Sequence, residues 1–78
     1  MNYFLDVPSG EFDDVRDLMK TKARVTPYDS YPHPSDGRYH RIEFERENPR
    51  DKTKNCLGRH GIESFPLDGS LARDGSVI

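Results

Sequence analysis

The stretch Arg38–Arg46, RYHRIEFER, alternates apolar and charged side chains more clearly than the rest of the chain. Alternation with a period of two is typical of a β-strand that buries one face. We expect one face, made of His40, Ile42 and Phe44, to pack against a helix, with His40 as a half-buried structural residue at its margin. The other face carries Tyr39, Arg41, Glu43 and Glu45. Its mixed charges favour ion pairs across the sheet or contact with another protein.

The helix that covers this strand is predicted over residues 11–20. Its apolar side chains recur at helical spacing, at Phe12, Val15, Leu18 and Met19. Ser9 is a plausible N-cap, and acidic residues occupy the first turn, where the helix dipole favours them. Basic residues follow at the other end, as the same dipole prefers. These signals agree with one another, so this is the best-supported helix in the sequence.

The remaining segments have weaker patterns. Residues 2–7 read as a first strand, with Tyr3, Leu5 and Val7 on one face and Phe4 on the other. A short strand is predicted over residues 23–26, followed by an irregular proline-rich loop over residues 27–37. Residues 48–55 read as a polar loop. Residues 56–65 contain closely spaced glycines and suggest a strand entering a turn, then a short helical turn.

These elements predict an α+β fold made of a single small domain, because 78 residues leave no room for a second core. One helix is expected to pack on a three- to four-stranded, mainly antiparallel sheet. The domain is predicted to span residues 1–67, and residues 68–78 to form a flexible C-terminal tail with two Asp-Gly-Ser turns. The expected core consists of Tyr3, Leu5, Val7, Phe12, Val15, Leu18, Met19, Val25, Ile42, Phe44, Leu57, Ile62, Phe65 and Leu67.

Composition indicates the expected compartment. The net charge is −2, and Cys56 is the single cysteine, so no disulfide can form within the chain and a reducing environment suits the free thiol. The first residues have no basic segment followed by a long apolar run, and no stretch approaches the length of a membrane helix. We therefore expect a cytoplasmic protein without a membrane partner.

Catalysis and metal binding have little support in the sequence. The nearest metal-ligand spacing is Cys56-x3-His60, which supplies half of a zinc site, and His33 and His40 would have to arrive from a loop and a strand. A nucleophilic cysteine would need an adjacent imidazole, and no cysteine-hydrolase signature surrounds Cys56. We expect no metal, no cofactor and no enzymatic activity.

Nucleic-acid binding is the first of two functional alternatives. Residues 38–60 contain seven basic and four acidic residues, together with aromatic side chains that could stack on bases. The overall pI of about 5.8 and the acids within this segment oppose phosphate binding. This alternative would use Arg38, Tyr39, Arg41, Arg50, Lys52 and Lys54.

Protein binding is the alternative that we favour. Acids cluster in the predicted helix, and tyrosines beside prolines lose little entropy on binding. The predicted contact residues are Asp13, Asp14, Asp17, Tyr28, Tyr31 and Arg41. The acids suit a partner with a basic surface. We expect a stoichiometric inhibitor or adaptor, and one variant is a virus- or plasmid-borne protein that blocks a host nucleic-acid-handling enzyme.

Overall fold

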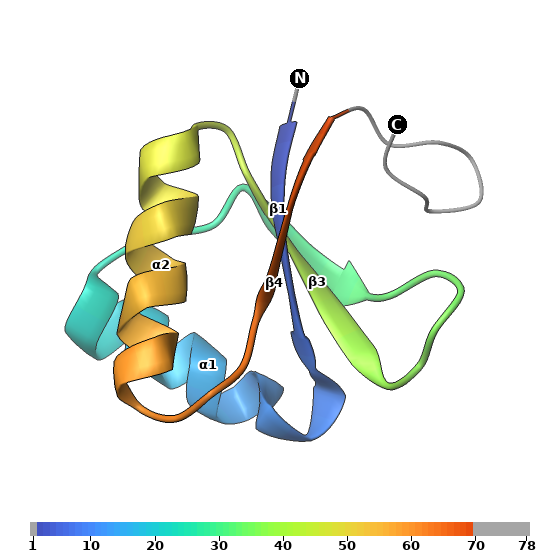
Figure 1. The fold of residues 1–78 in the computed structure, drawn as a ribbon, viewed down its shortest axis with the longest axis horizontal. Coiled ribbons are helices and arrows are strands. Elements are labelled where there is room, and N and C mark those ends of the chain that lie inside the picture. Colours follow the sequence, from blue (N-terminus) through green and yellow to red (C-terminus); the bar gives the residue numbers. More distant parts are fainter. Residues whose placement is uncertain (1, 70–78) are drawn as a thin grey trace.

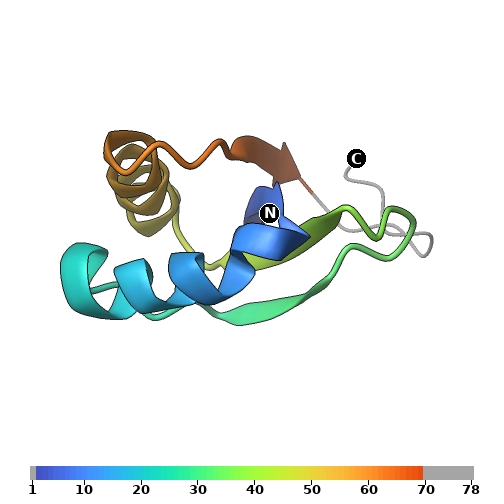
Figure 2. The same cartoon turned by 90° about the horizontal axis from the view of Figure 1, so that it is seen from below.

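The sheet is built around the pairing of its two central strands, β1 (Asn2–Pro8) and β3 (Tyr39–Phe44). In the computed structural model, which describes residues 2–69, β2 (Asp29–Pro32) lies beside β3 and β4 (Phe65–Gly69) lies beside β1. The order is β2-β3-β1-β4, and every neighbouring pair is antiparallel. Figure 2 shows β2 and β4 at opposite edges of the sheet.

Two helices cover one face of this sheet (Figure 1). The first, α1 (Phe12–Leu18), follows a 3-10 turn (Ser9–Glu11) and continues into a π turn (Met19–Ala23). The second, α2 (Glu47–Arg59), connects β3 to β4. The element order β-α-β-β-α-β is the split βαβ arrangement, in which a third strand lies between the two strands that each helix connects. The α+β class with an antiparallel sheet is confirmed.

The main core lies between the helices and the sheet, as the alternation in β3 predicts. Its buried members are Leu5, Val7, Val15, Met19, Ile42, Phe44, Leu57 and Ile62. Four more predicted core residues pack at its margin: Tyr3, Phe12, Leu18 and Val25. The helical spacing of α1 and the alternation of β1 and β3 therefore identify most of the core.

The prediction that Phe65 and Leu67, both in β4, belong to the main core was wrong. Phe65 lies opposite Asp6 and Leu67 lies opposite Phe4 in the strand register, so both point to the face that the helices do not cover. Phe65 is 40% exposed, whereas Phe4, which was not expected in the core, is completely buried. A second apolar patch thus exists on the other face of the sheet.

The predicted polar loop over residues 48–55 is instead the first part of α2. Pro49 is tolerated because the first turn of a helix does not need its missing N–H. The side chains that α2 buries are Arg50, Thr53, Cys56 and Leu57, and two of these are polar. A helix whose inner face begins with arginine and threonine gives no apolar periodicity, so its sequence resembles a loop.

The short strand predicted over residues 23–26 was also wrong. Ala23 ends the π turn, and Arg24 adopts the left-handed conformation with a φ of 54° that terminates the helix. The strand forms further along, as β2, inside the segment predicted to be an irregular loop. Pro32 is compatible with β2 because an edge strand can lack a hydrogen-bond donor on its free side.

Ser9 does not act as a side-chain N-cap. Its hydroxyl donates to the carbonyl oxygen of Gly37 at 2.8 Å, and its amide donates to the carbonyl oxygen of Arg38 at 2.9 Å. The residue therefore fastens the connection after β1 to the loop before β3. At the other end of the chain, β4 includes Asp68 and Gly69, and the rest of the tail predicted from residue 68 lies outside the described residues.

Arg50 joins α2 to β4 from a buried position. Its guanidinium forms ion pairs with Asp68 and Asp51, donates to the carbonyl oxygen of Leu67 at 3.2 Å, and lies 5.5 Å from the ring centre of Tyr3. The residue is 6% exposed. A single side chain thus satisfies the polar groups at the meeting point of helix and edge strand.

We predict that Arg50→Ala lowers the free energy of unfolding by about 1–3 kcal/mol, because it removes several charge-assisted hydrogen bonds whose acceptors are half-exposed. Urea denaturation followed by circular dichroism measures the change. Arg59→Ala is the matched control, since this exposed arginine near the end of the same helix should cost less than about 0.5 kcal/mol. Equal effects of the two substitutions would contradict the assigned role.

Candidate functional site

The polar face of β3 is occupied by a buried ion pair with β1. Arg41 lies opposite Asp6 in the strand register, and its Nε and Nη2 atoms donate to the two carboxylate oxygens at 2.9 and 3.1 Å. Arg41 is 2% exposed and Asp6 is 8% exposed. The predicted cross-strand ion pairing is therefore present, and it removes Arg41 from the exposed surface.

His33 and Tyr31 border this ion pair. The Nε2 atom of His33 lies 2.9 Å from Arg41 Nη2, and its Nδ1 atom accepts hydrogen bonds from the amides of Ser35 and Asp36. Burial, followed by the charge of Glu43, raises the pKa of Tyr31. Among the described residues, none forms a hydrogen bond with the buried Tyr31 hydroxyl. The His33 amide also donates to the carbonyl oxygen of Tyr39 at 3.0 Å, which holds the loop after β2 to the sheet.

The six predicted contact residues do not form one surface. Asp13, Asp14 and Asp17 are exposed on α1, on the helix side of the sheet. Tyr31 and Arg41 lie opposite each other in the β2–β3 register, on the other side. Tyr28, immediately before β2, is 64% exposed. A single partner surface could therefore contact the acids or the Tyr31–Arg41 side, but not all six residues together.

Three of the seven basic residues in segment 38–60 form ion pairs within residues 2–69. Arg41 binds Asp6, Arg50 binds Asp68 and Asp51, and Arg38 binds Asp36 with two hydrogen bonds of 3.0 and 2.8 Å. The bonds from Arg38 hold the pKa of Asp36 at about 2. Three of the cations proposed for nucleic-acid binding are thus neutralised by carboxylates of the same chain.

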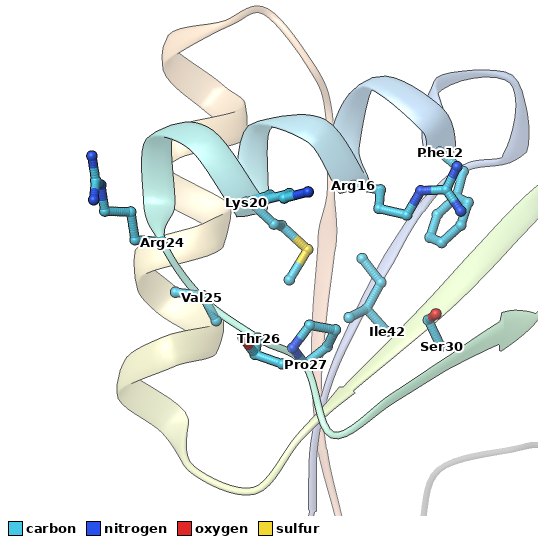
Figure 3. A pocket seen from close by; sticks show the side chains of 10 residues that line it. Phe12, Arg16, Lys20, Arg24, Val25, Thr26, Pro27, Ser30 and Ile42 are labelled. Atoms are coloured by element: carbon cyan, nitrogen blue, oxygen red, sulfur yellow. The ribbon is translucent and has the colours of Figure 1, made fainter.

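A groove opens on the helix side of the sheet, between α1 with its π turn and the edge strand β2 (Figure 3). Its volume is about 310 Å³. Apolar side chains make up much of its lining, namely Phe12, Met19, Val25, Pro27 and Ile42. The groove exists because β2 is short and begins after the Arg24–Pro27 segment crosses from the helix layer to the sheet.

Three cations line the same groove: Arg16, Lys20 and Arg24. Figure 3 shows Arg16 beside Phe12 and Arg24 at the far end of the π turn. Arg16 makes an exposed 3.2 Å ion pair with Asp13, whereas Lys20 and Arg24 form no ion pair with any residue in the range 2–69. No acidic residue occurs among the described residues that line the groove.

A second hollow adjoins the groove across Val25. It measures about 290 Å³ and is lined by Val25, Arg46, Asn48, Pro49 and Lys52. Within the described part of the chain, no carboxylate pairs with Arg46 or Lys52 and none lines this hollow. Val25 is therefore bordered on both sides by cations without an ion pair in the described residues, whereas the hollow beside Thr26 and Pro27 also contains Glu45.

Sequence reasoning missed this groove. Arg16, Lys20 and Arg24 are spaced four residues apart, a pattern that places cations on one side of a helix. Of these three, the sequence prediction uses Lys20 alone, as a basic residue that the dipole favours at the C-terminal end of the helix. The spacing was a usable signal, but the apolar floor depends on strands that are distant in sequence.

Cys56 and His60 contact each other through the backbone. Cys56 is a buried free thiol, and the Nδ1 atom of His60 lies 2.9 Å from the Cys56 carbonyl oxygen. Over residues 2–69 no three metal-ligating side chains gather in a way that could hold an ion. Over the same range, no helix has the length and apolar character needed to cross a membrane.

Comparison with protein-family models, curated proteins and solved structures finds no match to this chain. The fold and the groove therefore have to be interpreted from their own geometry and charge.

We predict that Asp6→Asn lowers the free energy of unfolding by about 3 kcal/mol, because it removes the carboxylate that faces a buried guanidinium. Urea denaturation measures the loss. Glu45→Gln makes the same change of charge at an exposed residue in the bend directly after β3, and it should cost less than about 0.5 kcal/mol. A loss of similar size in both variants would show that Asp6 has no special role.

A pH dependence is expected from His40, which stacks on Phe12 with ring centres 3.6 Å apart. Burial and then the nearby Arg16 charge lower the pKa of His40 in the folded state. The unfolded chain therefore takes up the proton first, and stability decreases as the pH falls below about 6.5 toward the lowered folded value. His40→Phe keeps the stacking and should flatten the dependence of the unfolding midpoint on pH between about 6.5 and 5. An unchanged slope would refute this assignment.

Proposed function

We propose that this chain is a small protein-binding domain that acts by stoichiometric binding, as an inhibitor or adaptor, and that the groove beside α1 is its contact site. The observation that carries the proposal is an apolar groove of about 310 Å³ lined by three cations, two of which form no ion pair within residues 2–69. Exposed apolar surface next to unneutralised charge is characteristic of interaction sites.

The pattern of neutralised charge supports protein binding over nucleic-acid binding. The basic residues of segment 38–60 that lie nearest the aromatic side chains are held in ion pairs, at Arg38, Arg41 and Arg50. On the open face, Phe4 is completely buried, so its ring is not presented for base stacking. The predicted cytoplasmic location agrees with a buried free thiol at Cys56 and stays a prediction.

The acidic residues of α1 define a second region that a protein partner could contact. Asp13, Asp14 and Asp17 are exposed on the helix that also borders the groove. A partner covering α1 could therefore meet both regions, with its acids facing the groove and its bases facing these carboxylates. Simultaneous reversal of the three acids tests the second region separately from the groove.

We predict that Ser30→Tyr abolishes capture of the partner when tagged chain is expressed in the cells that encode it and bound proteins are identified by mass spectrometry. Ser30 is an exposed residue of the edge strand and lines the groove, so a tyrosine there would occupy the space above Met19 and Ile42 without replacing a side chain of the main core. Lys22→Gln, an exposed cation of the π turn outside the groove lining, is the matched control and should retain the partner.

Two results would contradict this proposal. One is capture of the same partner by wild type and Ser30→Tyr. The other is tight binding of fluorescent single- or double-stranded oligonucleotides with a steep salt dependence, which is the signature of phosphate contacts.

A further inference from the structure

The chemistry of the groove also indicates what binds in it, an inference that rests on the proposed function. The floor is apolar and continuous with the core through Met19 and Ile42. Such a floor releases water only when an apolar group covers it. The occupant must therefore present at least one apolar side chain, which a purely charged ligand lacks.

The edge strand beside the groove does not accept another strand. The backbone amide of Ser30 donates to the Asp29 carboxylate at 2.8 Å, and Pro32, the next residue on the same side, has no N–H. Edge strands that satisfy or lack their donors in this way resist pairing with a new strand. The occupant therefore binds through its side chains and has to satisfy its own backbone, which an α-helix does.

The cations of the groove define the charge of the occupant. Arg16 and Lys20 are four residues apart, so their Cα atoms are separated by about 6 Å along the helical axis, and Arg24 follows as the left-handed residue that ends the π turn. Acidic residues at the same spacing on a partner helix would match them. Arg46 and Lys52, across Val25, extend the positive charge in the adjoining hollow.

A nucleic acid fits the same groove less well. Phe12 is its only aromatic lining residue among those described, and one face of its ring is stacked on His40 while Arg16 lies 5.7 Å from the ring centre. A base that entered would find a single aromatic ring with one face already covered by His40, and the aliphatic part of the floor would stay uncovered.

We infer that the groove binds a short acidic amphipathic helix of a partner protein, with leucine-like side chains on the apolar floor and glutamates or aspartates facing Arg16, Lys20 and Arg24. The apolar anchors supply the affinity, and the acids fix the direction and register of the helix.

Fluorescence anisotropy with synthetic peptides tests this inference on the full chain. The probe is a fluorescein-labelled peptide of three Leu-Leu-Glu-Glu repeats. A Ser-Ser-Glu-Glu peptide removes the apolar anchors, and a Leu-Leu-Lys-Lys peptide reverses the charge. We expect the first peptide to bind and the other two to bind at least about tenfold more weakly, the effect of about 1.4 kcal/mol.

Variants of the protein locate the binding. Lys20→Gln combined with Arg24→Asn should weaken binding of the acidic peptide about tenfold, since two exposed ion pairs are lost. Asparagine is chosen because residue 24 is left-handed, with a φ of 54°, a conformation that asparagine tolerates. Ser30→Tyr should abolish binding, and Lys22→Gln combined with Arg59→Gln removes the same charge elsewhere and should leave it unchanged.

The inference is overturned if the acidic peptide does not bind, if it binds no better than the Ser-Ser-Glu-Glu peptide, or if the groove and control variants bind equally. If a single-stranded oligonucleotide displaces the acidic peptide from wild type but does not bind Ser30→Tyr, the groove binds a nucleic acid and the inferred helix is wrong. If wild type does not bind the acidic peptide but captures a cellular partner that Ser30→Tyr fails to capture, the acidic helix is refuted and the proposed function stands.

Discussion

The antiparallel register between β1 and β3 is the constraint on which the structure depends. It places Leu5 opposite Ile42 on the helix side and Asp6 opposite Arg41 on the other side. A slip of one residue would turn the core side chains toward the open face and the ion pair into the core. Because a buried charge without its partner is costly, the ion pair and the core enforce the same register from opposite sides.

The two faces of the sheet consequently have different roles. The helix side is the main core, covered by α1 and α2. The other side buries Phe4 and the Asp6–Arg41 pair, and Phe65 and Tyr39 meet there edge to face with ring centres 5.8 Å apart. The charges of this face pair with one another and stabilise the sheet. The cations without such partners in the described residues lie mainly beside α1 and around Val25.

The distribution of charge in the fold differs from its distribution in the sequence. In the segment richest in bases, residues 38–60, three arginines form ion pairs with carboxylates outside it: Arg38 with Asp36, Arg41 with Asp6 and Arg50 with Asp68. The less basic first half supplies Lys20 and Arg24, which have no such partner in residues 2–69. Local counts of acids and bases therefore do not show which charges remain unpaired once folding brings opposite charges together.

The sequence by itself determined the strand β3, the strand β1, the helix α1 and most of the core, because each shows the period of its own secondary structure in apolar residues. Tertiary structure decided α2, β2 and the groove. The inner face of α2 is stabilised by the ion pairs of Arg50 and by a hydrogen bond from the Thr53 hydroxyl to the Pro49 carbonyl at 2.9 Å, which leave no apolar pattern. The groove needs α1 and β2 side by side, and their packing distance depends on the whole sheet rather than on any local stretch.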